Sequence, residues 1–191
     1  MIKSALKLIE PSVVKELVRL EPETGRLIWL PRDIRYFASS TDIYQERLCK
    51  IWNLRFSDKE GFITPGPKGY LYGKLLHRTA KAHLVVFALA HGKWPDGVID
   101  HINGIPFDNR PENLRDVGPL ENARNAKRRR DNQSGVTGVS RASRGMSWCA
   151  HIRINGASIH IGQFKNFDDA VAARSQAERD FGFHPNHGRA A

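Results

Sequence analysis

Hydrophobic residues near the N-terminus follow a helical period, which then changes to that of a strand. After Pro11, four apolar residues share one helical face: Val13, Val14, Leu17 and Leu20. A short helix is therefore expected over "PSVVKELVRLE", with the proline in its first turn. "EPETGRLIWL" follows, and its Thr24-Gly25 pair predicts a turn into a strand. From Pro31 to Gly69 the pattern is irregular and indicates only loops and short strands.

The central part of the chain combines apolar elements with a polar loop. "TAKAHLVVFALAHG" has an apolar face that predicts a helix, and Gly92 supplies its C-terminal stop. "WPDG" then turns the chain into a short apolar strand, Val98-Ile99, which leads into Asp100-His101. "NG" and "NRP" indicate a loop, "NLRDV" a second strand, and "PLENARNAKRRR" has the proline start and the residue types of another helix. The expected order is strand, loop, strand, helix.

Beyond the polar, glycine-containing linker "DNQSGVTG", hydrophobic positions alternate with a period of two. The expected inward positions of "WCAHIRI" and "SIHIGQF" are Trp148, Ala150, Ile152, Ile159 and Ile161. Asn155-Gly156 lies between these two strands and is a strong hairpin signal. "NFDDAVAARSQAERDFG" predicts a helix with Asn166 as its N-cap. One face of that helix is expected to pack through Ala170, Ala173, Ala177 and Phe181.

These elements predict an α+β fold in three parts. The first is an N-terminal α/β region over residues 1–75, and the second is the strand–loop–strand–helix unit over residues 76–130. The third, over residues 131–191, is a three-stranded antiparallel sheet with one helix. Composition agrees with a globular chain, because 40% of its 191 residues are hydrophobic and 26% are charged.

The cysteines and the apolar runs bear on the compartment. Cys49 and Cys149 are far apart and belong to no paired motif, which excludes a cysteine-rich zinc knuckle and predicts a reducing environment. The N-terminus lacks the apolar core of a signal peptide. The longest apolar run, "LVVFALA", is far shorter than the roughly 20 residues that span a bilayer. A soluble protein of the cytoplasm, with no membrane partner, is expected.

The charge balance favours a polyanionic partner. The chain carries 30 Lys and Arg against 20 Asp and Glu, a formal net charge of +10. Basic side chains that neutralise phosphates release condensed counterions, which drives binding to nucleic acids. A basic surface that serves solubility, or one that attracts a membrane, would have the same composition. A nucleic acid is the leading expectation for the partner, and the sequence motifs must distinguish it from these alternatives.

The stretch "VIDHINGIPFDNRPENLRDVGPLENARN" gathers residues suited to phosphodiester hydrolysis, which needs an activated water, a Lewis acid and fixed geometry. Asp100, at a strand end, offers a carboxylate oxygen for a divalent cation. Asn122, at the start of the following helix, offers an amide oxygen. His101 points to the opposite face of the strand, where its imidazole can act as the base. Asn113 can hold the His101 ring through a hydrogen bond.

This run resembles the His-Asn-His (HNH) endonuclease motif, in the phage and intron-homing branch in which the last His is Asn. The residues "IDHING", "DNR" and "NLR" carry the resemblance. It implies a ββα-metal core with Asp100 and Asn122 as metal ligands, His101 as general base and Asn113 as its orienter. Mg²⁺ or Mn²⁺ would be the cofactor, since both suit oxygen ligands. His83 lies where the family also tends to have His, and we expect it to be structural or to contact phosphate.

Each of these residues also has a structural explanation. An Asp-His pair is most often a surface turn, Asn-Gly and Asn-Arg-Pro are turn sequences, and Asn122 alone fits a helix cap. Their joint occurrence on a matching strand–loop–strand–helix frame favours the nuclease site. Other polar residues of the loop are expected only to build it: Asn103, Asp108, Asn109 and Arg110. A basic run is expected to contact DNA phosphates, although such runs are often solvated helix ends: Arg124, Lys127, Arg128, Arg129 and Arg130.

Residues from about Ser134 to Phe181 resemble the AP2 DNA-binding domain, a three-stranded sheet and helix whose strands enter the major groove. "SGVTGV", "IHIGQF" and "DDAVAARSQAE" carry the resemblance. It implies DNA contacts from the outward face of the sheet: Ser140, Arg144, His151, Arg153, Ser158 and His160. Arg153 matches an arginine that the family uses on DNA, whereas four other positions depart from the family's Arg or Trp. Arg141 is expected to contact phosphate. An ordinary polar scaffold face is the alternative.

The expected function is a metal-dependent DNA endonuclease of phage or mobile-element type. Its partner is double-stranded DNA, to which the AP2-like sheet directs it, and it acts as a monomer or a homodimer. The alternative is a non-catalytic, sequence-specific DNA-binding protein built from the same modules, and RNA is a further partner that the charge allows. His184 and His187 fit a structural tail better than a metal pair.

Overall fold

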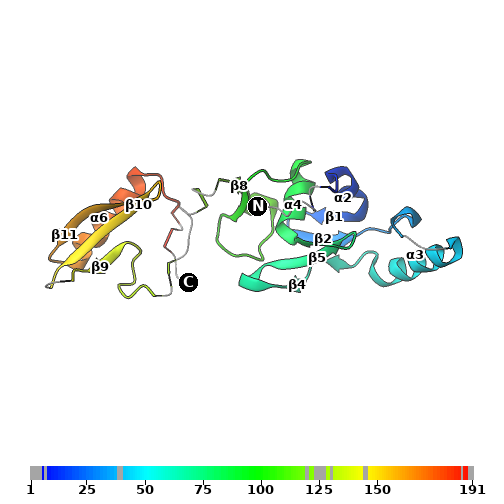
Figure 1. Cartoon of the computed structure of the whole chain (residues 1–191), viewed down its shortest axis with the longest axis horizontal. Coiled ribbons are helices and arrows are strands. Elements are labelled where there is room, and N and C mark those ends of the chain that lie inside the picture. Colours follow the sequence, from blue (N-terminus) through cyan, green and yellow to red (C-terminus); the bar gives the residue numbers. More distant parts are fainter. Residues whose placement is uncertain are drawn as a thin grey trace. The chain divides into compact units, whose positions relative to one another are not determined.

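The computed structural model describes residue 6 and residues 8–37, 41–118, 121–122, 128–129, 131–143, 146–185 and 187–188. The chain forms two compact units, residues 1–117 and residues 118–191 (Figure 1). The expected mixture of helices and antiparallel strands is confirmed, because both units contain small antiparallel sheets together with helices. In the described residues, no helix is both long and apolar enough to cross a membrane.

The first unit opens with a helix and a small sheet. Helix α2 (Pro11–Leu17) leads directly into β1 (Val18–Glu21), which pairs antiparallel with β2 (Arg26–Trp29). β3 (Glu60–Gly61) completes the sheet in the order β1-β2-β3. The predicted helix is correct in position but ends four residues early. Residues 18–21 pair across the turn at Gly25, whose φ of 71° permits the tight reversal.

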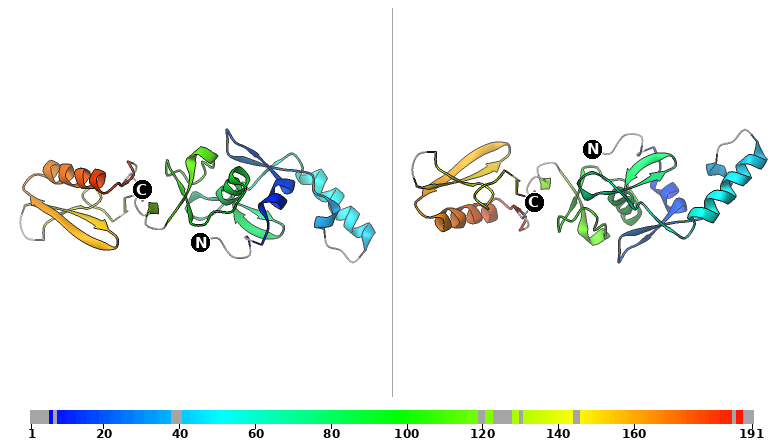
Figure 2. Two further views of the ribbon diagram at one scale, coloured as in Figure 1. Left: turned by 90° about the horizontal axis from the view of Figure 1, so that it is seen from above. Right: turned by 90° about the horizontal axis from the view of Figure 1, so that it is seen from below.

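The irregular segment contains a helix that its pattern did not predict. After η1 (Ile34–Tyr36), helix α3 (Asp42–Phe56) begins at Thr41, whose side chain accepts a hydrogen bond from the backbone N–H of Tyr44. None of its residues is fully buried, so no continuous apolar face marks it in the sequence. Figures 1 and 2 show α3 at the end of the first unit away from β8.

A second sheet and the buried helix α4 form the centre of the first unit. The sheet consists of β4 (Thr64–Pro65), β5 (Leu71–Leu75) and β6 (Arg78–Lys81), with η2 (Pro67–Gly69) before β5. Helix α4 (Ala82–His91) confirms the predicted helix and ends at Gly92, whose φ is 69°. Four side chains without solvent exposure represent the core around it: Val14, Leu17, Leu75 and Val85.

The predicted strand–loop–strand is confirmed. β7 (Val98–His101) pairs antiparallel with β8 (Leu114–Val117), and η3 (Pro111–Asn113) closes the loop between them. The helix expected after β8 falls mostly outside the described residues. Glu121 and Asn122 are helical, and residues 119–120, 123–127 and 130 are not described.

The second unit is a three-stranded antiparallel sheet with one helix against it. Its strands are β9 (Val139–Arg141), β10 (Trp148–Ile154) and β11 (Ala157–Phe164), in the order β11-β10-β9. Helix α6 (Phe167–Asp180) contacts all three strands, and Figure 2 shows it along the sheet. The hairpin predicted at Asn155-Gly156 is confirmed, and both residues have positive φ.

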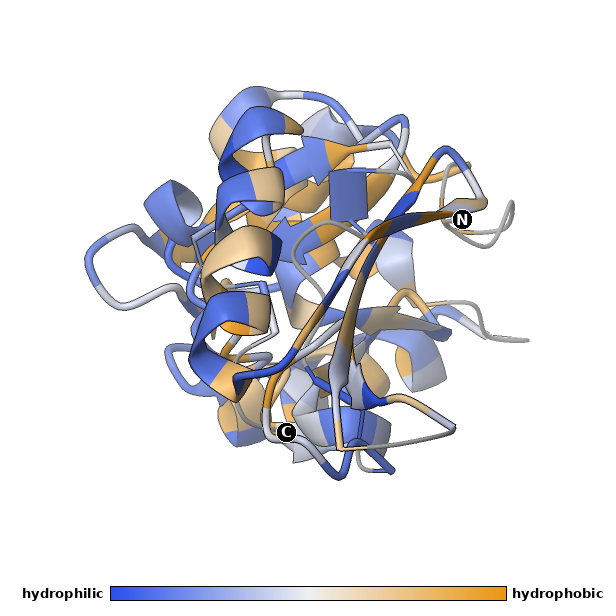
Figure 3. Cartoon of the chain, turned by 90° about the vertical axis from the view of Figure 1, so that its left-hand side faces the viewer, coloured by the Kyte–Doolittle hydropathy of each residue, from blue (hydrophilic) through white to orange (hydrophobic). Residues whose placement is uncertain are grey.

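The core of the second unit differs from the alternating pattern in two places. Figure 3 shows hydrophobic and hydrophilic residues alternating along the strands, but a β-bulge interrupts the register between Ala150 and His151 of β10. The packed face of α6 was also predicted partly wrongly. Ala170 and Ala177 are buried, whereas Phe181 is 42% exposed, and Arg174 is buried at 3% exposure. The hydrogen bonds of Arg174 explain why an arginine can be buried there. These bonds cannot be predicted from the residue type alone.

Candidate active site

The antiparallel pairing of β7 and β8 places an ion pair at the strand end. Asp100 lies opposite Arg115 in the register. Its Oδ2 accepts hydrogen bonds from Arg115 Nε at 3.0 Å and Nη2 at 2.8 Å. The Asp100 residue is 8% exposed, so this partner offsets part of the cost of burying the carboxylate. Arg115 was not expected at the site, although cross-strand pairing of the two predicted strands contained the signal.

The small polar residues of the loop build it through their own hydrogen bonds. Asn103 Nδ2 donates to Asp108 Oδ2 at 2.7 Å, and its Oδ1 accepts from the backbone N–H of Ile105 at 2.9 Å. The Arg110 guanidinium donates to both carboxylate oxygens of Asp108. These bonds, with that of Asn103, hold the pKa of Asp108 at about 2 against the cost of burial. The loop is therefore a rigid frame that follows β7.

The His101 ring is held by Asn109. Its Nε2 lies 3.2 Å from Asn109 Oδ1. A carbonyl oxygen can only accept a hydrogen bond, so this contact selects the ring tautomer with hydrogen on Nε2 and a lone pair on Nδ1. Burial lowers the pKa of His101 despite the opposing effects of Asn109 and the Asp100 charge, and the residue is 5% exposed. The imidazole is therefore neutral at pH 7, the state that a general base requires.

Contrary to the expectation from the sequence, Asn113 does not contact the His101 ring. Its Oδ1 accepts from the backbone N–H of Asn103 at 3.0 Å, and its Nδ2 donates to Asn103 Oδ1 and to the carbonyl of Asp108. In this structure Asn113 closes the loop and Asn109 orients the ring. In the sequence, Asn109 is one of several asparagines in the loop, and nothing there distinguishes it as the partner of His101. The path of the loop decides which asparagine reaches the imidazole.

Two further rings surround His101. The His83 ring, from α4, lies 5.2 Å from it and the Tyr70 ring 5.9 Å, measured between centroids. Lys81 Nζ lies 4.3 Å from the Tyr70 ring centroid. His83 is 4% exposed, and burial, with His101 and Lys81 nearby, lowers its pKa to about 3. The expectation that His83 is structural or contacts phosphate stays a prediction, and its place beside His101 makes it part of the same aromatic cluster.

The low pKa of His83 predicts a loss of stability in acid. The unfolded chain binds a proton near pH 6.5, whereas folded His83 does so only near pH 3. Stability should therefore fall as the pH drops from 6.5 towards 3, by up to about 1.4 kcal/mol per pH unit for this one proton. His83→Phe, which cannot titrate, should show a shallower decrease in denaturant unfolding midpoints over this range. An equal slope in both proteins would contradict this origin of acid sensitivity.

The ligands expected for a divalent cation lie in different units. Asp100 belongs to the first unit, and Asn122 to residues 118–191, where its backbone N–H donates to the carbonyl of Gly118 at 3.0 Å. Among the described residues, no group of three or more His, Cys, Asp or Glu side chains is arranged to hold a metal ion. The donor types nevertheless fit Mg²⁺, which takes few protein oxygens and keeps several waters. Two hydrogen bonds from Arg115 go to Oδ2, and a carboxylate has lone pairs on both of its oxygens.

Part of the basic run after Asn122 can be placed. Arg128 donates to the carbonyl of Gly135, and Arg129 forms a two-bond ion pair with Asp131 at 3.0 and 2.9 Å. Arg129 is highly exposed, so that pair holds it weakly. Three other members of the run, together with one expected sheet residue, lie outside the described residues: Arg124, Lys127, Arg130 and Arg144.

The sheet of the second unit presents a polar face with two histidines. His151 of β10 lies opposite His160 of β11, with ring centroids 5.4 Å apart. Arg153, two residues along β10 on the same face, donates from Nε to the carbonyl of Gly156. In the register Ser140 and Ser158 lie opposite residues of this face. The DNA contacts expected of these residues stay a prediction.

Arg141, which was expected to contact phosphate, and His187 have different surroundings from this polar face. Arg141 lies opposite Trp148 in the register, and its guanidinium carbon lies 4.5 Å from the Trp148 ring centroid. His187 packs on the Phe183 ring at 4.8 Å, and its Nε2 lies 3.5 Å from Arg174 Nη2. His187 is therefore part of the packing around α6.

Comparison with known proteins gives two matches. Residues 80–124 match the model of the HNH endonuclease family. The chain is also similar to Protein 3.8 of Escherichia phage T7, with 33% identity over 84 residues that cover 44% of this chain and 69% of that protein. No solved structure matches the chain. The family match spans Asp100, His101 and Asn109, and it continues through Asn122.

Proposed function

Because the chain belongs to the same family as phage Protein 3.8 and carries an HNH endonuclease domain at residues 80–124, we propose that it is a metal-dependent DNA endonuclease. The single observation that carries the proposal is a neutral, oriented imidazole beside a carboxylate. His101 and Asp100 are adjacent on β7, His101 is held by Asn109, and Asp100 is held by Arg115. A base and a candidate cation ligand thus project from one short strand.

The proposed reaction is hydrolysis of a phosphodiester bond. A water adjacent to the phosphate loses a proton to Nδ1 of His101, the nitrogen that the Asn109 contact leaves with a lone pair. The water oxygen bonds to phosphorus in line as the bond to the 3′ oxygen breaks, and that oxygen takes a proton from solvent. Deprotonated water is a far better nucleophile than water itself. Asn109 acts by fixing the tautomer and the direction of the lone pair.

A divalent cation is the proposed cofactor. Asp100 and Asn122 would hold it, and the cation would supply Lewis-acid stabilisation of the charge that develops on the phosphate. Arg115, which donates two hydrogen bonds to Oδ2 of Asp100, would hold the carboxylate in its orientation. Mg²⁺ and Mn²⁺ both suit oxygen donors, so either can satisfy this site.

The second unit is proposed to bind double-stranded DNA. The polar face with His151, Arg153 and His160, and the basic run before it, support this assignment. A β-ribbon can enter the major groove, where base edges differ in their hydrogen-bond donors and acceptors. AP2-like targeting by this unit, and action as a monomer or a homodimer, remain parts of the proposal.

Cleavage of supercoiled plasmid tests the enzymatic proposal. The purified full chain is expected to convert plasmid to nicked or linear forms with Mg²⁺ or Mn²⁺ present, and to give no conversion with a chelator. Restoring the cation after chelation should restore the conversion, which controls for damage to the protein. Conversion that persists in chelator would contradict metal dependence.

The non-catalytic alternative has one observation in its favour, the ion pair that engages Asp100 with Arg115. In that case the plasmid would be retarded in a gel with and without the cation, and it would stay supercoiled. That outcome would leave a DNA-binding protein that uses both units and would overturn the endonuclease proposal.

A further inference from the structure

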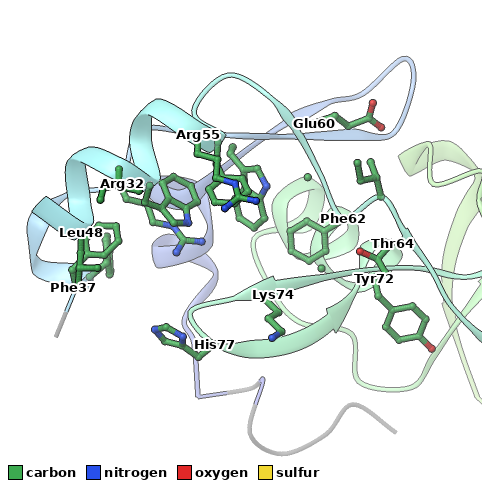
Figure 4. Close-up of a pocket in the computed structure, with 18 residues that line it drawn as sticks. Arg32, Phe37, Leu48, Arg55, Glu60, Phe62, Thr64, Tyr72, Lys74 and His77 are labelled. Atoms are coloured by element: carbon green, nitrogen blue, oxygen red, sulfur yellow. The ribbon is translucent and has the colours of Figure 1, made fainter. Parts of the chain in front are cut away.

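A pocket lies in the first unit, beside α3 and away from the candidate active site. It has a volume of about 620 Å³, and neither Asp100 nor His101 lines it. Figure 4 shows Arg32 and Arg55 close to α3, and Thr64 and Tyr72 on the other side of the opening. Pockets of roughly 300–1,000 Å³ are the usual size for small ligands.

Aromatic side chains form the pocket wall. The Trp29 and Trp52 rings meet edge to face with centroids 5.8 Å apart, and Phe62 lies 5.2 Å from Trp29. Phe56 lies 5.3 Å from Trp52. Three of these rings come from β2 and α3, so they are brought together by tertiary packing. Trp29 and Phe62 are largely buried, whereas Trp52 and Phe56 are half-buried, so the latter two offer the apolar ring surface suited to a planar ligand.

Three cations line the same pocket without acidic partners. The guanidinium carbon of Arg32 lies 3.8 Å from the Trp52 ring centroid, and its Nε is buried without a hydrogen-bond partner. Burial lowers the pKa of Arg32 to about 10, so it stays protonated at neutral pH. Arg55 and Lys74 are exposed at the pocket. Among the described residues of the first unit, none of these three forms an ion pair with a carboxylate.

The acidic side chain at the pocket does not neutralise this charge. Glu60 is the acidic residue among those that line it, and its Oε2 lies 3.7 Å from Arg26 Nε instead. The pocket thus combines stacking surfaces with an excess of positive charge. A ligand that complements both must have a planar ring and a negative group within one residue's length.

We propose that this pocket binds one unpaired nucleotide of a DNA strand, with its base against the Trp29 and Trp52 rings and its phosphate near Arg32, Arg55 and Lys74. Single strands are held in this way in general, by stacking bases on aromatic rings and by cations along the backbone. Duplex DNA alone would not use the aromatic wall, and an uncharged apolar peptide would not use the cations. The inference rests on the proposed function for its choice of DNA as the partner.

Photocrosslinking tests this site directly. The full chain would be mixed with a single-stranded oligodeoxythymidine that carries one 5-iododeoxyuridine, in the presence of chelator so that cleavage is prevented. After irradiation, mass spectrometry would locate the crosslinked residue. A crosslink at Trp52 or Phe56, or at the edge of Trp29, is expected. Crosslinking only at Trp148, in the second unit, would overturn the proposal.

Charge variants with matched controls measure the cation contribution. Arg55→Gln and Lys74→Gln together should weaken oligonucleotide binding roughly tenfold, and Arg32→Met, which keeps the side-chain length, should do the same. Arg47→Gln and Lys59→Gln together change the same charge at exposed positions outside the pocket and should have little effect. Equal weakening by the two double variants would overturn the proposal, because it would show only general attraction.

Ligand controls separate the base from the phosphate. An oligonucleotide with an abasic site at the crosslinking position should bind more weakly, since it loses the stacking contact. Equal affinity would overturn the nucleotide assignment, as would displacement of the oligonucleotide by a short apolar peptide with a free carboxylate. Because binding is measured in chelator, its outcome is independent of cleavage. A plasmid-cleaving protein without the crosslink would refute this inference alone, and a crosslinked but inactive protein would refute only the nuclease.

Discussion

Replacing His101 by alanine is expected to lower the rate of plasmid cleavage by roughly 10²–10⁴-fold, the range for loss of a general base. The ring is the neutral imidazole next to Asp100, and it is the one that Asn109 contacts. Affinity for the same plasmid in chelator should stay within about twofold, because in the proposed reaction His101 acts on the attacking water and not on the DNA itself. Cleavage rates and gel retardation, measured on one preparation, check both statements.

Two further variants separate the base from its support. His91→Ala removes an exposed histidine from the end of α4 and should leave cleavage unchanged. Asn109→Ala keeps the imidazole but removes its orienting contact, so its rate should fall between those of the wild type and His101→Ala. Its pH–rate profile should also shift, which a purely structural loss would not produce. Cleavage by His101→Ala at the wild-type rate would show that the base lies elsewhere.

Replacing Arg174 by alanine is expected to destabilise the second unit by about 3 kcal/mol or more, as for one partner removed from a buried pair. Arg174 is 3% exposed, its Nη2 lies 3.1 Å from Glu178 Oε1, and its Nε donates to the carbonyl of Thr137 at 3.1 Å. Burial raises the pKa of Glu178, which the arginine charge opposes. Truncation would leave the carboxylate and the Thr137 carbonyl without this donor, as well as a cavity.

Hydrogen exchange measures this loss within the full chain. Amides of α6 and β10 should lose protection in Arg174→Ala, while those of α4 in the first unit should not. Arg179→Ala is the matched control on the same helix, because Arg179 is exposed and its guanidinium donates to Gln176 at the surface. If the α6 amides are equally protected in both variants, Arg174 contributes no more to the stability of the second unit than a surface arginine does.

Much of the local structure could be predicted because it depends on short-range patterns. The period of α4 and its Gly92 stop, the alternation in β10, and the Asn155-Gly156 hairpin each lie within a few residues. Helix α3 could not be predicted in this way, since its buried contacts are few and come from scattered aromatic residues. A helix that packs through isolated rings shows no continuous apolar face in its sequence.

The candidate site could likewise be predicted only in its local features. Asp100 and His101 could be identified from sequence because their residue types and their adjacency on a strand are local properties. The partners of these two residues could not. Arg115 reaches Asp100 through strand register, and Asn109 reaches the ring because the loop bends back over it. The expected partner, Asn113, carries the same functional group, so only the course of the backbone distinguishes the two.

The sequence by itself determined the order of most elements, the basic charge and the residue types that make hydrolysis chemically feasible. The tertiary structure alone decided that Asn109 contacts the His101 ring, that Arg174 lies inside the second unit, and that aromatic rings and cations meet at one pocket. The physical reason is range. Periodicity and turn chemistry act between near neighbours, whereas hydrogen-bond partners and pocket walls are chosen among groups that only folding brings within a few ångströms.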